Sequence, residues 1–379
     1  MIVHRCVGGR VGLMGNPSDG FGGKTIAALL GDFYARVALW ETPKLEIIPH
    51  PYLDPFSFDS IDHLAEVASD DGYYGGVRLL YATCKTFHSY CEQSGIHLNG
   101  DNFTLEYDSN IPRQVGLAGS SAIITGGLNC LMEFYGLTDR EVPQELQPQI
   151  VLSVETDELE IQAGLQDRVI QVYGGLMYMD FERAHMEAKG HGRYERLETS
   201  KLPPLYTAYV PRSTECSGKL HNNMRYRYEN GDAEVVASMK EFARYTDLAR
   251  TAIDEGDHEA LGDLMNRNFD LRRKLYGDDD LGRHNLEMIE IARNCGLPAK
   301  FPGSGGAIVG TYDDPGRLAF ATEALNARGY EVQPVTPTEE VVAAGPGVSE
   351  EYPEVRCAPV GAFHAAARNG HYQPVAVGK

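Results

Sequence analysis

A glycine-rich loop between a predicted strand and an apolar helix pattern restricts the fold of this chain more than any other feature. From Asn110 the sequence reads NIPRQVGLAGSSAIITGG, with Gly116 and Gly119 followed by two serines. The first turn of a helix presents unpaired N–H groups, and glycines let an anion approach that backbone. The serine hydroxyls can add contacts to a phosphate oxygen or to Mg²⁺. The segment is therefore either a phosphate-binding loop or an ordinary turn before a serine-capped helix.

A second glycine-rich stretch, GNPSDGFGGKT over residues 15–25, ends like the P-loop of Walker-type NTPases. A P-loop needs a glycine, four free positions and then Gly-Lys-Ser/Thr. The position that requires the first glycine holds Ser18. No apolar strand ending in Asp is placed to hold Mg²⁺ either. We therefore exclude a Walker-type NTPase.

The length of 379 residues exceeds what one hydrophobic core usually organises, so two domains are expected. Near LETSKLPPL, residues 197–205, two adjacent prolines interrupt both helix and sheet patterns. We place the boundary there, giving domains over residues 1–200 and 201–336. Residues 337–379 are rich in Pro, Gly, Ala and His and predict an extension with no assignable chemistry.

The charge and cysteine content restrict the partners and the compartment. Lys and Arg number 34 against 54 Asp and Glu, a net charge of -20 with no basic run, which argues against nucleic acid and membrane surfaces as partners. The seven cysteines are scattered and never spaced CxxC, as expected for free thiols. Without a signal-peptide pattern or a long apolar stretch, a cytoplasmic location is predicted. The sequence does not specify an oligomeric state.

Strand and helix patterns alternate in the first half of the chain, whereas long amphipathic helices dominate the second. The first half predicts strands that begin at Arg10, Ala35, Lys44 and Phe103, and helices that begin at Tyr74, Ser121 and Pro148. The second half predicts helices over residues 232–256, 258–277, 285–296 and 313–329, with short strands AIVGTY and EVQPV. This order predicts an α+β protein with an α/β first domain and an α+β second domain.

Two carboxylates in the segments after the glycine-rich loop from Asn110 are candidates for binding a ligand or a metal. Asp167 lies beside Arg168 in a turn-like GLQD segment, where it can orient a substrate hydroxyl next to a guanidinium. Glu155 follows the apolar residues VLSV, and a carboxylate among apolar residues needs a metal or a cation. A third glycine-rich segment, KFPGSGGA from Lys300, predicts by itself only a turn.

The order of these segments resembles the three-motif layout of the GHMP small-molecule kinases, named for galacto-, homoserine, mevalonate and phosphomevalonate kinases. The resemblance covers residues 5–335 and follows GRVGLMGNPSD, NIPRQVGLAGSSA, GLQDR and KFPGSGGA in that order. NPSDGFGGKTIA, DGYYGGVRLL and AGLQDRVIQVYGGLMYMDF are most similar to the plant-type glucuronokinases. The resemblance implies a two-domain fold with a C-terminal ferredoxin-like domain and an active site between the domains.

The resemblance also implies a role for individual residues. Asp167 is expected to accept or orient the proton of the attacking hydroxyl, and Arg10 to lie near it. Mg²⁺ is expected on Ser121 and Glu155. The ATP phosphates are expected on Gly116, Leu117, Ala118, Gly119, Ser120, Ser121 and Ala122. The acceptor is expected near Asp19, Lys24, Arg168, Gly303, Ser304 and Gly305.

The implied reaction transfers the γ-phosphoryl group of ATP to the anomeric hydroxyl of D-glucuronate. A uronic acid needs a cation for its carboxylate; Lys24 is the first candidate, with Arg113 and Arg168 behind it. Pro302 departs from the family pattern, because a Thr or Ser usually stands there. Galactose, arabinose, fucose, galacturonate or a heptose phosphate are alternative acceptors. A non-catalytic sugar or nucleotide sensor is the alternative from another class.

Overall fold

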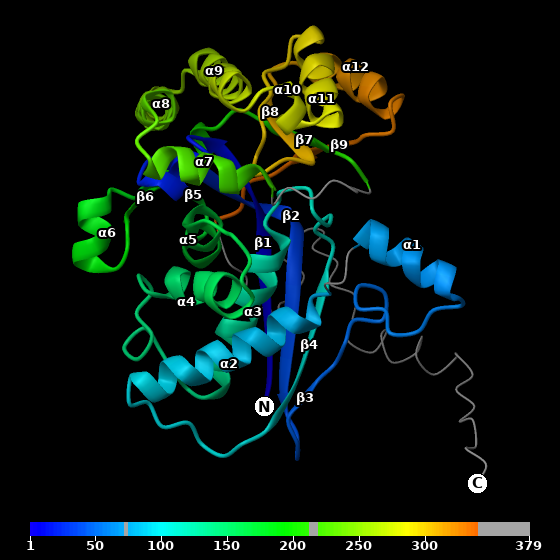
Figure 1. Cartoon of the computed structure of the whole chain (residues 1–379), viewed down its shortest axis with the longest axis vertical. Helices are drawn as coiled ribbons and strands as arrows, with labels where there is room; N and C mark the ends of the chain where they lie inside the picture. Colours follow the sequence, from blue (N-terminus) through cyan, green and yellow to red (C-terminus); the bar gives the residue numbers. More distant parts are fainter. Residues whose placement is uncertain (72–74, 212–218, 340–379) are drawn as a thin grey trace. The chain divides into compact units, whose positions relative to one another are not determined.

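A long β-hairpin organises the first half of the chain (Figure 1). Strands β1 (Ile2–Met14) and β2 (Lys24–Glu41) pair antiparallel along most of their length, with irregularities near Gly9 and Leu13. The computed structural model describes residues 1–71, 75–211 and 219–339, which belong to one compact unit.

The long strand β2 is shared by two parts of one sheet. Its C-terminal half pairs with β4 and its N-terminal half with β5, so the order is β3-β4-β2-β5-β6 with β1 beside β2. Only the short pair β3 and β4 is parallel within this sheet. The added strands are β3 (Glu46–Ile47), β4 (Phe103–Ser109), β5 (Leu176–Asp180) and β6 (Arg193–Leu197).

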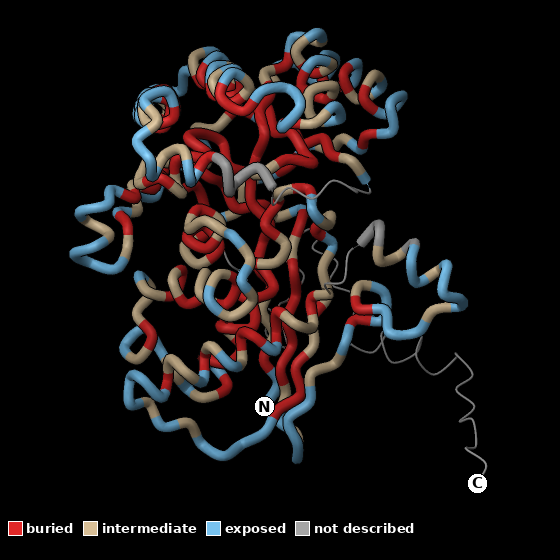
Figure 2. The backbone as a smooth tube through the Cα atoms, viewed as in Figure 1, coloured by how far each residue is buried: buried red, intermediate tan, exposed pale blue. Residues whose placement is uncertain are grey.

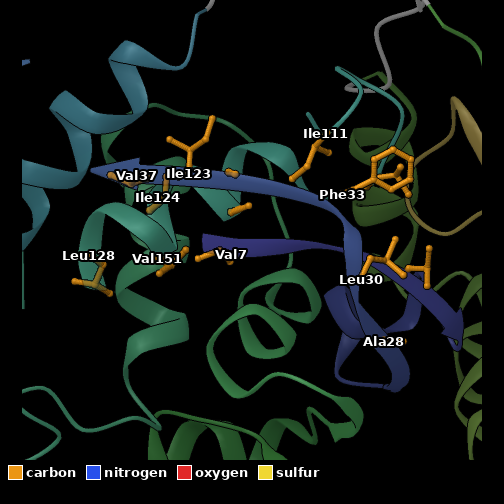
Figure 3. Packing of buried hydrophobic residues seen from close by; sticks show 14 of the residues in the cluster. Val7, Ala28, Leu30, Phe33, Val37, Ile111, Ile123, Ile124, Leu128 and Val151 are labelled. Atoms are coloured by element: carbon orange, nitrogen blue, oxygen red, sulfur yellow. The ribbon is translucent and has the colours of Figure 1, made fainter. Parts of the chain in front are cut away.

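Helices contact this sheet through the apolar side chains of β1 and β2. Helix α3 packs on both strands, and α5 does so beside it. Figure 3 shows Val7 of β1 and Val37 of β2 in one buried cluster with Ile124 and Leu128 of α3. The helices of this half are α1 (Ile61–Asp71), α2 (Val77–Gln93), α3 (Gly119–Phe134), α4 (Gln147–Ser153), α5 (Leu165–Tyr173) and α6 (Arg183–Lys189).

The second half forms a smaller antiparallel sheet with its own helices, drawn at the top of Figure 1. The strand order is β8-β7-β9, from β7 (Leu205–Tyr209), β8 (Ala307–Thr311) and β9 (Glu331–Val335). A second core gathers large apolar side chains that include Tyr206, Phe242, Phe269 and Phe301. The helices are α7 (Lys219–Glu229), α8 (Ala233–Glu255), α9 (His258–Tyr276), α10 (Asp278–Leu281), α11 (Arg283–Asn294) and α12 (Pro315–Asn326).

The two halves share buried surface where the hairpin meets α8 and α9. Figure 2 shows buried residues running along β1 and β2 and continuing into the inner faces of the second-half helices. The end of the described chain returns to the first sheet: Gly31 N–H donates to Thr336 O (3.0 Å) and Thr338 N–H to Leu29 O (2.9 Å). Residues 337–339 of the predicted extension are thus bound to β2, and residues 340–379 lie outside the described residues.

Several sequence predictions are confirmed and others are wrong. Strand β4 and the strands AIVGTY and EVQPV lie where they were predicted, as do the long helices. The strands predicted from Arg10 and Ala35 begin at Ile2 and Lys24 instead, so the last two residues of GGKT lie in β2 and its two glycines precede the strand. GLQD is the first turn of α5 and not a turn between elements. Glycines in β1 obscure the alternation of apolar and polar residues, and β2 is buried on both faces. Neither strand therefore shows the two-residue hydrophobic period that predicts a strand.

Two further differences concern short or interrupted elements. The strand predicted from Lys44 shrinks to Glu46–Ile47. The helix predicted from Pro148 ends at Ser153 and continues as a π-helical turn over Val154–Glu158. Such turns often occur at functional sites, because the extra residue rotates the following side chains to a new direction. The predicted segment DGYYGG includes residues 72–74, which lie outside the described residues.

Candidate active site

A cavity of about 450 Å³ lies where β1, the phosphate-loop candidate, α5, α9 and the third glycine-rich segment meet. Its wall carries five arginines and three carboxylates, so an anionic ligand is favoured even though the whole chain is acidic. These residues are Arg10, Arg78, Arg113, Arg168, Arg272, Asp19, Glu155 and Asp167.

The loop from Gly116 to Ser120 forms one wall of this cavity and ends in the first turn of α3. Gly116 and Ala118 both adopt left-handed backbone conformations, with φ of 71° and 64°. A side chain at Gly116 would come within 3.0 Å of Gly305 O, so glycine is what permits the two loops to touch. The predicted phosphate residues Gly116–Ser120 line the cavity, whereas Ser121 and Ala122 are buried behind it.

Glu155 is held between a serine and an arginine. The Ser120 hydroxyl donates to its Oε1 at 2.8 Å, and the Arg168 guanidinium pairs with its Oε2. Ser121 Oγ instead donates to Ala118 O at 3.3 Å and is fully buried. The predicted metal pair of Ser121 and Glu155 therefore does not meet, and Ser120 takes the place of Ser121 beside the carboxylate.

Arg10 connects three segments of the site. Its Nε lies 2.6 Å from Asp167 Oδ1, and its Nη1 donates to Gly116 O (2.6 Å) and Pro302 O (3.1 Å). Arg168 approaches the other oxygen of Asp167 at 3.3 Å. Burial lowers the pKa of Arg168 to about 9, with a smaller contribution from the charge of Arg10. The two predicted catalytic residues thus lie in contact, facing the phosphate-loop candidate.

Asp19 and Lys24 were both predicted for the acceptor, but the structure separates them. Asp19 lines the cavity, where burial and then the charge of Asp167 raise its pKa to about 6. Lys24 is absent from the wall, and its Nζ binds both carboxylate oxygens of Asp247 at 2.9 Å each. The position of Lys24 therefore does not fit a role in binding the acceptor carboxylate.

The third glycine-rich segment turns its carbonyl groups toward cations. Gly303 O and Ser304 O accept hydrogen bonds from Arg272 at 2.8 and 3.2 Å. Gly303 and Ser304 line the cavity, whereas the predicted Gly305 does not. Pro302, which departs from the family pattern, still contributes its carbonyl oxygen to Gly12 N–H at 3.0 Å and to Arg10.

Comparison with known proteins shows which family this chain is similar to. Residues 78–175 match the GHMP kinases N terminal domain, and residues 249–331 match the GHMP kinases C terminal domain. The chain is 47% identical over 335 residues to Glucuronokinase 1 of Arabidopsis thaliana. This alignment covers 88% of the chain and 91% of that protein. The chain belongs to the GHMP kinase family.

Solved structures of other GHMP kinases share the fold. The Lactococcus lactis galactokinase complexed with galactose aligns with a TM-score of 0.67 at 16% identity, covering 90% of this chain and 95% of that one. The L. major mevalonate kinase in complex with R-mevalonate aligns with a TM-score of 0.62 at 19% identity, covering 89% and 97%. The predicted GHMP kinase fold is confirmed.

The sequence prediction missed two residues of this GHMP kinase site, Arg272 and Gln166. Both are almost fully buried on the cavity wall. In α9 the buried face runs through Leu261, Met265, Asn268 and Arg272, so two polar residues continue an apolar stripe. Polar residues at helical spacing on an otherwise apolar face were the available signal.

No helix among the described residues is long and apolar enough to cross a membrane.

Proposed function

We propose that this GHMP kinase transfers the γ-phosphoryl group of ATP to the anomeric hydroxyl of D-glucuronate, giving glucuronate 1-phosphate and ADP. The identity with the Arabidopsis glucuronokinase supports the acceptor. The observation that carries the chemistry is the contact of Arg10 with Asp167 on a wall shared with the Gly116–Ser120 loop. A carboxylate and a guanidinium that share a wall with an anion-binding loop support phosphoryl transfer to a hydroxyl at this site.

Catalysis by these residues consists of positioning and charge stabilisation. Asp167 accepts a hydrogen bond from the anomeric hydroxyl and orients it for in-line attack, and it is the group that takes the proton. Arg10 fixes Asp167 and stabilises the charge that develops on the transferred group. The first-turn N–H groups of α3 bind phosphate oxygens. Asp19 accepts hydrogen bonds from sugar hydroxyls.

Mg²⁺ would be held by Ser120 and Glu155 of this chain together with the phosphates of ATP. The donor set fits, because a hydroxyl and a carboxylate oxygen that lie 2.8 Å apart are hard ligands on the cavity wall. When bound, Mg²⁺ neutralises phosphate charge.

The domain limits and the compartment remain part of the proposal. Domains over residues 1–200 and 201–336 are supported by the change of sheet between β6, which ends at Leu197, and β7, which begins at Leu205. A reducing cytoplasm is supported by the five described cysteines, all of them free thiols.

A coupled ADP-release assay tests the proposed reaction. The acceptors are D-glucuronate, D-galacturonate, D-galactose, D-glucose, L-arabinose and L-fucose, each with Mg²⁺ and ATP. We expect turnover with glucuronate to exceed that with every other acceptor. Faster turnover of a neutral sugar contradicts glucuronate as the preferred acceptor but remains consistent with a sugar kinase. Absence of turnover across the panel with intact ATP binding contradicts the reaction and favours a sensor.

A further inference from the structure

We propose that Arg272 binds the carboxylate of the uronic acid and thereby selects glucuronate over neutral sugars. This inference rests on the proposed function, because it names the residue that recognises its acceptor. Arg272 takes the place of Lys24 as the candidate for binding the acceptor carboxylate, because the ammonium group of Lys24 is bound to Asp247.

Arg272 is a rigidly held guanidinium on the cavity wall. It is 2% exposed, yet it lines the cavity. Its Nη1 and Nη2 donate to Gly303 O and Ser304 O, and its Cζ lies 5.1 Å from the ring centroid of Phe301 and 5.5 Å from that of Tyr276. Because packing and hydrogen bonds already fix the side chain, a ligand that binds it has little side-chain entropy to overcome.

No carboxylate of the described residues forms an ion pair with Arg272. Its partners are carbonyl oxygens and aromatic rings, and its buried Nε–H finds no acceptor in the described part of the chain. Burial lowers the pKa of this guanidinium, while Tyr276 and Asp19 oppose the shift. A buried cation without a counter-ion is costly, and a ligand carboxylate supplies both the missing charge and an acceptor for the terminal N–H groups that the two carbonyl oxygens leave free.

Two other buried arginines of the wall already have carboxylate partners. Arg10 is paired with Asp167, and Arg168 with Glu155. A substrate carboxylate at either of them would compete with an existing ion pair. Arg272 carries no such pair among the described residues, and it lines the same cavity as Asp19, the residue proposed to bind sugar hydroxyls. Arg272 is therefore a buried arginine of this wall that a substrate carboxylate can bind without displacing an ion pair of the described residues.

The test measures equilibrium binding by isothermal titration calorimetry, with D-glucuronate, its neutral amide D-glucuronamide and D-glucose as ligands. In Arg272→Gln the affinity for glucuronate should fall roughly thirtyfold or more, the loss typical of one partner of a buried charge pair. Affinities for glucuronamide, glucose and ATP should change less than about threefold, since only the carboxylate contact is removed. Arg272→Lys keeps the charge without the fork, so it should lose less than Arg272→Gln.

Arg273→Gln is the matched control, because it removes the same charge one position along α9, where Arg273 pairs with Asp278 outside the cavity wall. Equal losses for glucuronate and glucuronamide overturn the inference and identify Arg272 as a residue that only holds the 303–304 loop. Unchanged glucuronate affinity in Arg272→Gln overturns it as well. If Arg272→Gln does not fold, Arg272→Lys is titrated with the same three ligands. The inference then requires a larger loss of affinity for glucuronate than for glucuronamide and glucose.

Failure of the proposed function is distinguishable in the same experiment. Wild-type protein that binds glucuronate more tightly than glucuronamide but does not phosphorylate it contradicts the reaction, and the variants still decide the role of Arg272. Wild-type protein that binds the two ligands equally overturns the inference, whichever sugar it phosphorylates.

Discussion

Four buried basic residues at or next to the candidate active site fall into two sets that differ in their counter-ions. Arg10 and Arg168 are paired with Asp167 and Glu155. Arg272 and Lys300 are equally buried, but among the described residues their hydrogen-bond acceptors are carbonyl and amide oxygens. The first set is electrically complete without a ligand, and the second is not. The comparison separates the two members of the second set as well: Arg272 lines the cavity and is the proposed site for the acceptor carboxylate, whereas Lys300 does not line it.

Lys300 shows how a cation is kept in place without a carboxylate. Its Nζ donates to Gly12 O, Asn16 Oδ1 and Phe301 O, each at 2.6 Å. Burial, followed by the charges of Arg272 and Arg10, moves its pKa well below the usual range. Three hydrogen bonds from the amino group offset part of the cost of its burial. Lys300 thus fastens the third glycine-rich segment to β1 and does not line the cavity.

The largest expected effect comes from replacing Asp167, the counter-ion of Arg10 in the first set. Asp167→Asn should lower turnover at least about a hundredfold, the lower end of general-base effects, because the amide cannot take a proton. Nucleotide affinity should stay near that of wild type, since Asp167 acts on the acceptor hydroxyl. ADP release and binding of a fluorescent ATP analogue measure the two quantities. Asp157→Asn, at an exposed position of the same region, is the control. Near-normal turnover removes Asp167 from the mechanism.

The second prediction concerns Lys300, a member of the second set. Lys300→Met leaves three buried oxygen acceptors without a donor, and removal of a costly buried charge offsets part of that loss. The free energy of unfolding should fall by about 2 kcal/mol, as measured by urea denaturation without ligands. Lys240→Met, on the exposed face of α8, should change it by less than about 0.5 kcal/mol. Equal values for the two variants contradict a fastening role for Lys300.

The third prediction asks which serine completes the environment of Glu155. Ser120→Ala should raise the Mg²⁺ concentration needed for half-maximal activity about tenfold, as loss of a metal-site contact commonly does. Ser121→Ala should change it less than about twofold, because the Ser121 hydroxyl is bound to Ala118 O. Titration of Mg²⁺ at saturating ATP compares the variants. The reverse ranking restores the serine that the sequence favoured.

The smallest effect concerns the pH dependence of Asp19, which lines the same cavity as Arg10, Arg168 and Arg272. Its pKa is about 6 in the folded protein against an ordinary value of 3.8. The folded state therefore holds the proton more tightly, and the free energy of unfolding should fall as pH rises from about 4 to about 6. Relative to wild type, Asp19→Asn should gain about 1 kcal/mol across that window, allowing for partial solvent access. Urea denaturation at several pH values measures this gain, and a difference that is constant with pH contradicts it.

Local sequence was enough to predict the parts of the site that lie within single motifs. The Gly116–Ser120 loop, Glu155 and the Asp167 neighbourhood each lie in a short stretch whose residue types already indicate their chemistry, and the cavity wall contains all of them. The GHMP kinase fold followed from the order of such stretches along the chain. β1 and β2 were harder to predict, because their alternation is obscured by glycines and by burial on both faces.

The sequence by itself determined the family and indicated the phosphate-loop candidate and the carboxylate Asp167, because each is encoded by residues close together in the chain. Tertiary structure decided which serine meets Glu155, since neighbouring helical residues point about 100° apart and only packing fixes which one faces the cavity. It also decided that Lys24 is bound to Asp247 while Arg272 keeps an incomplete charge balance. Counter-ions come from segments far apart in sequence, so charge balance is a property of the folded chain alone.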